Sequence, residues 1–214
     1  MTHSPPFSEA PVPRRFSLTL LLVILNGVMF LGEEVAQRFL HWPFTHWLAL
    51  SVDGLKAGYF WQLLTFQFLH GGWIHLFLNS WALFLFGQEL EYFLGRASFL
   101  KLYLLSGVAG GLVQIFCALA LPEHFGGALV GASAGVFGLL AAFAALFPER
   151  QITLLLFFIL PLTLRAKTLL LWGVLLAIAG TLMPDDHIAH AAHLGGILGG
   201  LAYLNWTRSA PDVS

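Results

Sequence analysis

Three apolar stretches of the chain each carry a polar side chain of a type that takes part in acyl transfer. Ser133 lies near the start of one stretch, and His193 lies near the start of another. A serine hydroxyl becomes a nucleophile only when a base takes its proton, and histidine is the side chain that most often does so. A third stretch opens with His75 and Asn79, which lie four residues apart and therefore share one face of a helix. These residues predict a serine nucleophile with a histidine base.

Donors that could stabilise an oxyanion lie near the same residues. Asn79 offers a side-chain amide, His75 a ring N–H, and Ser133 a backbone N–H at the start of a helix, where such groups are unpaired. No Asp or Glu lies in an apolar stretch where it could orient His193. Asp185 and Asp186 precede that stretch in a loop, where we expect them to be solvated. We therefore predict a Ser–His dyad rather than a triad.

The composition places these residues in a membrane protein. Hydrophobic residues make up 58% of the 214 residues and charged residues only 10%, against about 25% charged in soluble domains. The formal net charge is −1, without a basic block, so nucleic-acid binding has no electrostatic support. Cys117 is the single cysteine, which excludes a disulfide within the chain.

The apolar stretches predict an all-α, polytopic membrane protein with six transmembrane helices. The predicted spans are residues 16–32, 73–90, 99–121, 128–147, 168–183 and 188–206. Residues 152–164 are also apolar, but thirteen residues would give a helix of only about 20 Å against a hydrocarbon core of about 30 Å. We expect this segment to be an interfacial or re-entrant connection. The chain divides into tails at residues 1–15 and 207–214 and one domain at 16–206.

The distribution of basic residues predicts the orientation. With six crossings, only Arg38 and Lys56 fall on the side opposite the termini, so both termini are predicted to be cytoplasmic. The basic residues on the side of the termini are Arg14, Arg15, Arg96, Lys101, Arg150, Arg165, Lys167 and Arg208. Residues 33–72 form a long outer loop whose tryptophans favour the headgroup layer. The spans that carry His75, Ser133 and His193 then begin on the outer side, which puts these residues at similar depth.

Small residues predict how two of the spans meet. Gly196 and Gly200 form a GxxxG step on the face of the helix that carries His193. The span that carries Ser133 offers a matching small face through Ala134, Gly138 and Ala141. Close contact between these faces would bring Ser133 near His193.

Four ordered motifs resemble those of the rhomboid family of intramembrane serine proteases. They are the HxxxxHxxxN pattern of His70, His75 and Asn79; Glu91-Tyr-Phe-Leu-Gly95; Gly131-Ala-Ser133-Ala-Gly135; and Ala192-His193-Leu-Gly-Gly196 with Gly200. The resemblance covers about residues 16–206. It implies a six-helix bundle that uses no metal or cofactor and cleaves transmembrane helices of other proteins near their extracytoplasmic ends. It also suggests a bacterial inner membrane as the location.

The resemblance implies a role for each matching residue. Ser133 is the nucleophile and His193 the base, while His75, Asn79 and the Ser133 N–H form the oxyanion hole. Supporting roles fall to His70, His190, Gly131 and Gly196. Two positions depart from the family pattern: Trp61-Gln62 stands where many members have Trp-Arg, and Ala134 follows the serine where many have Gly. The first puts the anchoring of the outer loop in doubt.

Other interpretations stay open at this point. Ser133 could be a small packing residue, since serine is common at contacts between membrane helices. The histidines on the outer side, His70, His75, His187, His190 and His193, could bind a metal or haem, although no acidic ligand lies within a span. A catalytically inactive relative that binds membrane clients is a third possibility. For an active protease, we expect the gate at residues 184–187 and the end of the fifth span.

Overall fold

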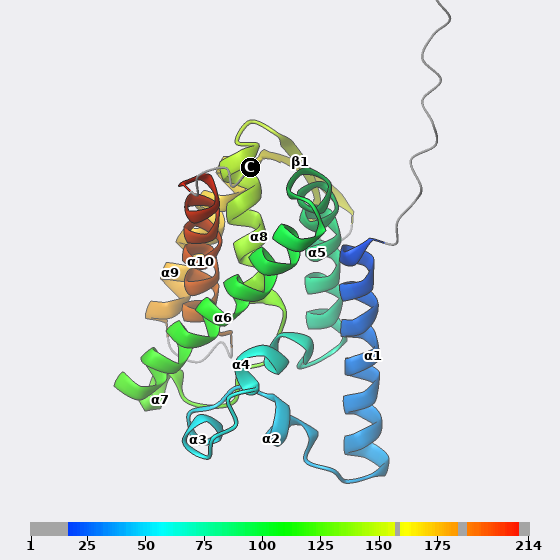
Figure 1. The fold of residues 1–214 in the computed structure, drawn as a ribbon, viewed down its shortest axis with the longest axis vertical. Helices are drawn as coiled ribbons and strands as arrows, with labels where there is room; N and C mark the ends of the chain where they lie inside the picture. Colours follow the sequence, from blue (N-terminus) through cyan, green and yellow to red (C-terminus); the bar gives the residue numbers. More distant parts are fainter. Residues whose placement is uncertain (1–16, 157–158, 184–187, 210–214) are drawn as a thin grey trace, which may run out of the picture.

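The computed structural model describes residues 17–156, 159–183 and 188–209, and these form a bundle of long helices (Figure 1). The long helices are α1 (Leu18–Phe39), α5 (Trp73–Leu94), α6 (Arg96–Ala120), α8 (Ser133–Leu146), α9 (Ala166–Leu182) and α10 (His190–Ser209). The described chain starts and ends at the same end of the bundle (Figure 1). The predicted tail at 1–15, residues 210–214 of the predicted tail at 207–214, and the predicted gate loop at 184–187 lie outside the described residues. Residues 207–209 belong to α10, which therefore extends beyond the predicted end of the span.

Two of the long helices, α1 and α6, are long and apolar enough by themselves to cross a bilayer. Helices α8 and α9 are apolar but shorter. Helices α5 and α10 have 22 and 20 residues, and polar side chains such as His75, Asn79 and His193 lower their mean hydropathy. The fold is thus mostly helical with clear apolar helices, while the full six-span bundle remains a prediction.

Helix α6 lies at the centre of the bundle and packs against both α8 and α10. Glycines allow the close approach: a Cβ added at Gly196 would overlap the carbonyl oxygen of Ala134, and one at Gly200 would overlap that of Gly138. The predicted contact between the small faces of α8 and α10 is therefore confirmed. This contact sets the distance between the two helices that carry Ser133 and His193.

A methyl group at Gly196 tests that contact. We expect Gly196→Ala to force α10 away from α8, with a loss of stability of about 1–3 kcal/mol from overpacking. Gly32→Ala is the matched control, because a Cβ on Gly32 in α1 would meet no atom within 4 Å. Thermal unfolding in detergent measures both, and equal melting temperatures for the two variants would contradict the role of Gly196.

Residues 126–132 correct one predicted boundary, because α8 begins at Ser133 and not at residue 128. The segment before it is extended: Leu129 exchanges two hydrogen bonds with Leu50, of 3.0 and 2.7 Å, and the Gly131 N–H donates to the Phe66 carbonyl at 2.9 Å. These bonds satisfy backbone groups that a helix would otherwise satisfy. They place Ser133, which is half-buried, at the first position of α8.

The outer loop contains short helices that the sequence did not predict. It contains α2 (Phe44–Leu48), α3 (Val52–Lys56), α4 (Gln62–Thr65) and the 3₁₀ helix η1 (Phe66–Phe68), and the later connection contains α7 (Pro122–Phe125). Helix α1 also extends two turns beyond residue 32, and the Glu33 carboxylate accepts a hydrogen bond of 2.9 Å from Thr45. These short helices lie at the end of the bundle opposite the described termini (Figure 1).

Gln62, which replaces the arginine of the family pattern, fastens this loop. Its side chain is fully buried. Its Oε1 accepts from the Ser51 N–H at 3.2 Å, and its Nε2 donates to the His46 carbonyl at 3.0 Å. The Trp61 indole N–H donates to the Trp47 carbonyl at 2.8 Å. The amide therefore anchors the loop without a charge.

Residues 152–164 depart from an all-α fold, because they form an antiparallel hairpin of β1 (Gln151–Leu156) and β2 (Leu160–Arg165). The sequence favours strands here, since Thr153 and Thr163 alternate with leucine or isoleucine and Pro161 disfavours a helix interior. The base of the hairpin is closed by a bond of 2.9 Å from the Ala166 N–H to the Arg150 carbonyl. The chain therefore returns to the end of the bundle that it left, as predicted for a segment that does not cross.

Candidate active site

Ser133 and His193 come together between the first turns of α8 and α10. The Ser133 Oγ and the His193 Nε2 lie 2.9 Å apart, within hydrogen-bonding distance. His193 is buried and Ser133 is half-buried. A base at this distance is able to take the serine proton without a change in the backbone. Two residues sixty positions apart thus form a nucleophile–base pair.

Phe137 holds the imidazole of His193 and was not identified from the sequence. Its ring stacks on that of His193 with a centroid separation of 4.3 Å and an interplanar angle of 16°. Phe137 lies one turn after Ser133 in α8, so both contact the same imidazole. The spacing of i and i+4 from a candidate nucleophile is the signal that could have found it. Stacking restricts the rotation of the ring in the position where Nε2 faces Ser133.

His75 presents its Nε2 to the same region. The Gly71 N–H donates to His75 Nδ1 at 3.3 Å, so the neutral ring carries its proton on Nε2. A Cβ added at Gly131 would lie 2.8 Å from that Nε2 and 3.7 Å from Ser133 Oγ. Gly131 also has a φ of 126°, which favours glycine. Gly131 therefore leaves the space in which a His75 N–H donor lies next to the serine.

Asn79 lies one turn further along α5 and is buried. Its Nδ2 donates to the His75 carbonyl at 3.0 Å. The amide thus lies on the same helix face as His75, as the spacing predicted. A second N–H on the same nitrogen remains for an oxyanion.

His70 lies beside His75, and His190 lies beside His193. The ring centroids of His70 and His75 are 5.3 Å apart, and those of His190 and His193 are 5.8 Å apart. His190 packs against Gly180 of α9, where a Cβ would overlap its ring. Within the described residues, no three His, Cys, Asp or Glu side chains are grouped as metal ligands. His187 lies outside those residues.

His70 gives a pH dependence of stability. Burial, followed by the charge of His75, lowers the pKa of His70 to about 4 from 6.5. Between these values the unfolded chain binds a proton that the folded chain does not. The free energy of unfolding should therefore decrease as the pH is lowered from 6.5 to 4, by up to about 3 kcal/mol. Thermal unfolding at a series of pH values should show a shallower acid-side decrease for His70→Phe; identical slopes would contradict the assignment.

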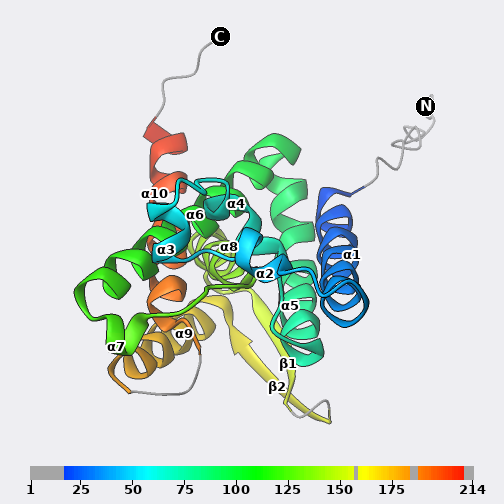
Figure 2. The same cartoon turned by 90° about the horizontal axis from the view of Figure 1, so that it is seen from below.

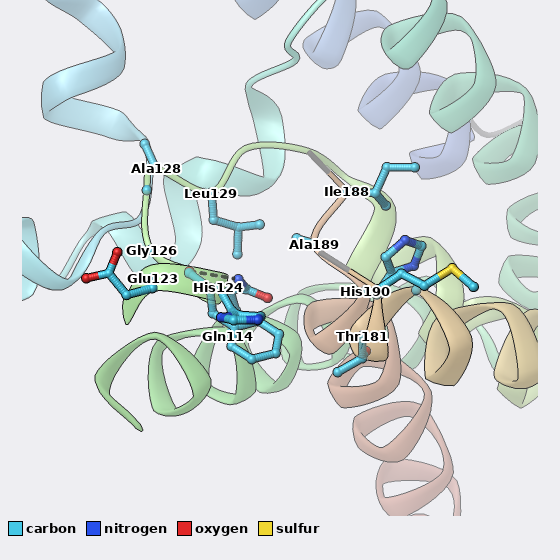
Figure 3. A pocket seen from close by; sticks show the side chains of 14 residues that line it. Gln114, Glu123, His124, Gly126, Ala128, Leu129, Thr181, Ile188, Ala189 and His190 are labelled. Carbon is cyan, nitrogen blue, oxygen red and sulfur yellow. Dashed lines mark hydrogen bonds between the residues drawn. The ribbon is translucent and has the colours of Figure 1, made fainter. Parts of the chain in front are cut away.

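A cavity of about 380 Å³ opens next to the pair, although neither Ser133 nor His193 lines it. Figure 3 shows its walls: Gln114 from α6, Glu123 and His124 from α7, Leu129 from the extended segment, and the start of α10. His190, whose ring centroid lies 5.8 Å from that of His193, forms part of the wall. The cavity therefore runs beside residues 126–129, which lead directly to Gly131 and Ser133.

The fold and the site define a class: a helical membrane protein in which a serine and a histidine meet between two helices. A rhomboid domain model matches residues 57–209. The chain therefore belongs to the rhomboid family of intramembrane proteases, as the motifs indicated.

Relatives with this domain come from mitochondria and from a bacterium. The chain is 35% identical over 94% of its length to rhomboid protein 1, mitochondrial, of Saccharomyces cerevisiae, and covers 56% of that protein. It is 33% identical over 86% of its length to presenilin-associated rhomboid-like protein A, mitochondrial, of Danio rerio, and covers 46% of it. It is 34% identical over 69% of its length to the putative rhomboid protease YdcA of Bacillus subtilis, and covers 67% of it.

These comparisons bear on length and location. The chain spans about half the length of the two mitochondrial relatives. The chain is a rhomboid membrane protein. Its relatives include both proteins named as mitochondrial and a bacterial protein, so they do not decide in which membrane it lies. The bacterial inner membrane and the cytoplasmic termini therefore remain predictions.

Proposed function

We propose that this chain is an intramembrane serine endopeptidase in which Ser133 is the nucleophile and His193 the general base. The observation that carries the proposal is the distance of 2.9 Å between Ser133 Oγ and His193 Nε2, in a family of intramembrane proteases. The proposed substrates are transmembrane helices of other membrane proteins. The proposed cut lies near the end of the substrate helix that faces the extracytoplasmic side, since Ser133 begins α8 at the helix end that faces away from the described termini (Figure 1).

The residues supply each step of acyl transfer. His193 takes the proton of Ser133 as Oγ attacks the scissile carbonyl carbon, and the carbonyl π electrons move onto the oxygen. The N–H groups of Ser133, His75 and Asn79 stabilise this oxyanion. His193 then protonates the leaving amine as the C–N bond breaks, which leaves an ester on Ser133. Water, deprotonated by His193, hydrolyses that ester and restores the hydroxyl.

The proposed position of the substrate follows from the extended segment before Ser133. Leu129 directs both of its backbone groups to Leu50. In an extended chain, the groups of Ala128 and Val130 point to the opposite side. An unwound substrate segment could add to that edge as a strand, with its side chains entering the cavity beside His190. Its scissile carbonyl would then reach Gly131 and Ser133.

An active-site probe tests the dyad directly. A fluorophosphonate reporter should label the wild-type protein on Ser133, because the hydroxyl is activated by the imidazole. We expect His193→Ala to lose that labelling while it keeps its melting temperature within a few degrees. His41→Ala is the matched control, since His41 is an exposed residue between α1 and α2 and does not line the cavity. Equal labelling of His193→Ala and wild type would refute the role of His193, and an inactive, client-binding relative would show no labelling of either.

A further inference from the structure

The β1–β2 hairpin has one apolar face and one polar face near its base. In the register Ile152 lies opposite Leu164 and Leu154 opposite Leu162, so these four side chains share a face. Gln151 lies opposite Arg165 and Thr153 opposite Thr163 on the other face, where the two threonine hydroxyls are 2.9 Å apart. The apolar face begins on the core, because Ile152 is buried and Leu154 packs against the same cluster.

The apolar character continues to the far end of the hairpin, where the core does not reach. Ile159 is 84% exposed and Leu160 is 61% exposed. Figure 2 shows the two strands projecting outward beyond α5. In a chain with apolar membrane helices, exposed aliphatic side chains at the end of a projecting element favour contact with the lipid.

The base of the hairpin lies at a boundary marked by charge. It joins the end of α8 to the start of α9, and the Lys167 N–H donates to the Pro148 carbonyl at 3.2 Å. Arg150 pairs with Glu89, and Arg165 and Lys167 share Glu149, so three cations meet two carboxylates. Arg96 and Arg208 lie at the same end of the bundle. A positive layer at the ends of apolar helices is typical of the headgroup region of a membrane.

The backbone of the hairpin limits how deep it can lie. The described sheet has only two strands, so the outer edge of each strand is unpaired. Unpaired N–H and C=O groups are not tolerated in the hydrocarbon core, but they are hydrated among headgroups. Six residues per strand also give only about 20 Å, which is less than the hydrocarbon core. The hairpin therefore fits the interface of the bilayer and not a span.

We propose that the β1–β2 hairpin is an interfacial membrane anchor that lies on the lipid leaflet at the end of the bundle where the described chain starts and ends. Ile159 and Leu160, beyond the part of the apolar face that packs on the core, enter the boundary between headgroups and acyl chains. Arg150, Arg165 and Lys167 lie among phosphate groups, with an excess of positive charge for anionic lipid. Thr153 and Thr163 face water. Because the hairpin joins α8 to α9, its position in that leaflet fixes the depth of the end of α8 and of the start of α9 in the membrane.

Depth-dependent fluorescence quenching tests the anchor without any need for protease activity. In a Cys117→Ser background, Ile159→Cys or Thr153→Cys is labelled with bimane and placed in nanodiscs of phosphatidylcholine and phosphatidylglycerol, one copy per disc. Lipids brominated on the acyl chains should quench the label at 159 and not the label at 153. Iodide in the buffer should quench the label at 159 at least about twofold less than the label at 153, because the headgroup layer excludes it.

Each other outcome would overturn the proposal. Equal iodide quenching at both positions, without quenching by brominated lipid, would show that the hairpin lies in water. Protection of position 159 from iodide only in discs that hold two copies would show that a second copy of the chain covers it. Leu160→Cys gives a second reporter at the same end, and a melting temperature within a few degrees of the parent confirms that each labelled protein is folded.

Discussion

Ser133→Ala should abolish cleavage of a transmembrane substrate in liposomes, by roughly 10³-fold or more. The physical reason is that no other atom can replace Oγ as the nucleophile: His193 Nε2 lies 2.9 Å from it, and its loss leaves the base without a proton to take. The fold should persist, because Ser133 is the first residue of α8 and this helix start has no side-chain capping hydrogen bond to lose. The effect is measured as a time course of product formation. The wild-type protein is diluted until its rate equals that of the variant, and the dilution factor gives the fold loss.

Ser106→Ala is the matched control for this result. Ser106 is another buried serine, in α6, and its Oγ has no hydrogen-bond partner among the described residues, so its loss removes no bond. We expect it to keep cleavage within a few-fold of wild type. Full cleavage by Ser133→Ala would remove the nucleophile from the mechanism, whatever the distance to His193.

Gly131→Ala should have the second-largest effect, a loss of about 10²–10³-fold in kcat with the protein still folded. The added Cβ would lie 2.8 Å from His75 Nε2, so the ring must move away from the space next to Ser133. The φ of 126° adds backbone strain of about 1–3 kcal/mol for a residue with a side chain. Displacement of an oxyanion donor lowers the rate of the chemical step more than it changes substrate binding, so KM should change little.

Gly58→Ala separates the two causes. Gly58 has a φ of 88°, but a Cβ there would meet no atom within 4 Å. It therefore carries similar backbone strain without a displaced histidine, and we expect a lower melting temperature with cleavage near that of wild type. Should both variants lose cleavage alike, strain alone would explain the loss, and the proposed position of the His75 N–H would be wrong.

The contacts of Phe137 and Gln62 were not predicted from the sequence, unlike the pair of Ser133 and His193. Phe137 was missed because an aromatic residue within an apolar helix gives no signal of its own, and only the packing of α8 on α10 brings it over His193. The anchoring by Gln62 was also hidden, because its partners Ser51 and His46 lie in a loop whose path no periodicity fixes. In both places the contact partner is distant or irregular in the sequence.

The hairpin shows where composition misleads. Residues 152–164 are apolar enough to suggest a helix in a membrane, and only their length and the basic residues on both flanks argued against a crossing. The alternation of threonine with aliphatic residues favours strands, but only the paired structure decides which residues lie opposite one another, as Thr153 and Thr163 do.

By itself, the sequence determined that this is an apolar membrane protein with a serine, a set of histidines and an asparagine in fixed positions on helices. It did so because burial of polar groups in apolar stretches is costly, so each such residue indicates a partner or a function. Only the tertiary structure decided that Ser133 and His193 are hydrogen-bonded, that Gly131 leaves space for His75, and that Phe137 stacks on the imidazole. Those facts depend on helix separations of a few ångströms, which are set by the summed packing of glycines and side chains on α6, α8 and α10 and by no single local pattern.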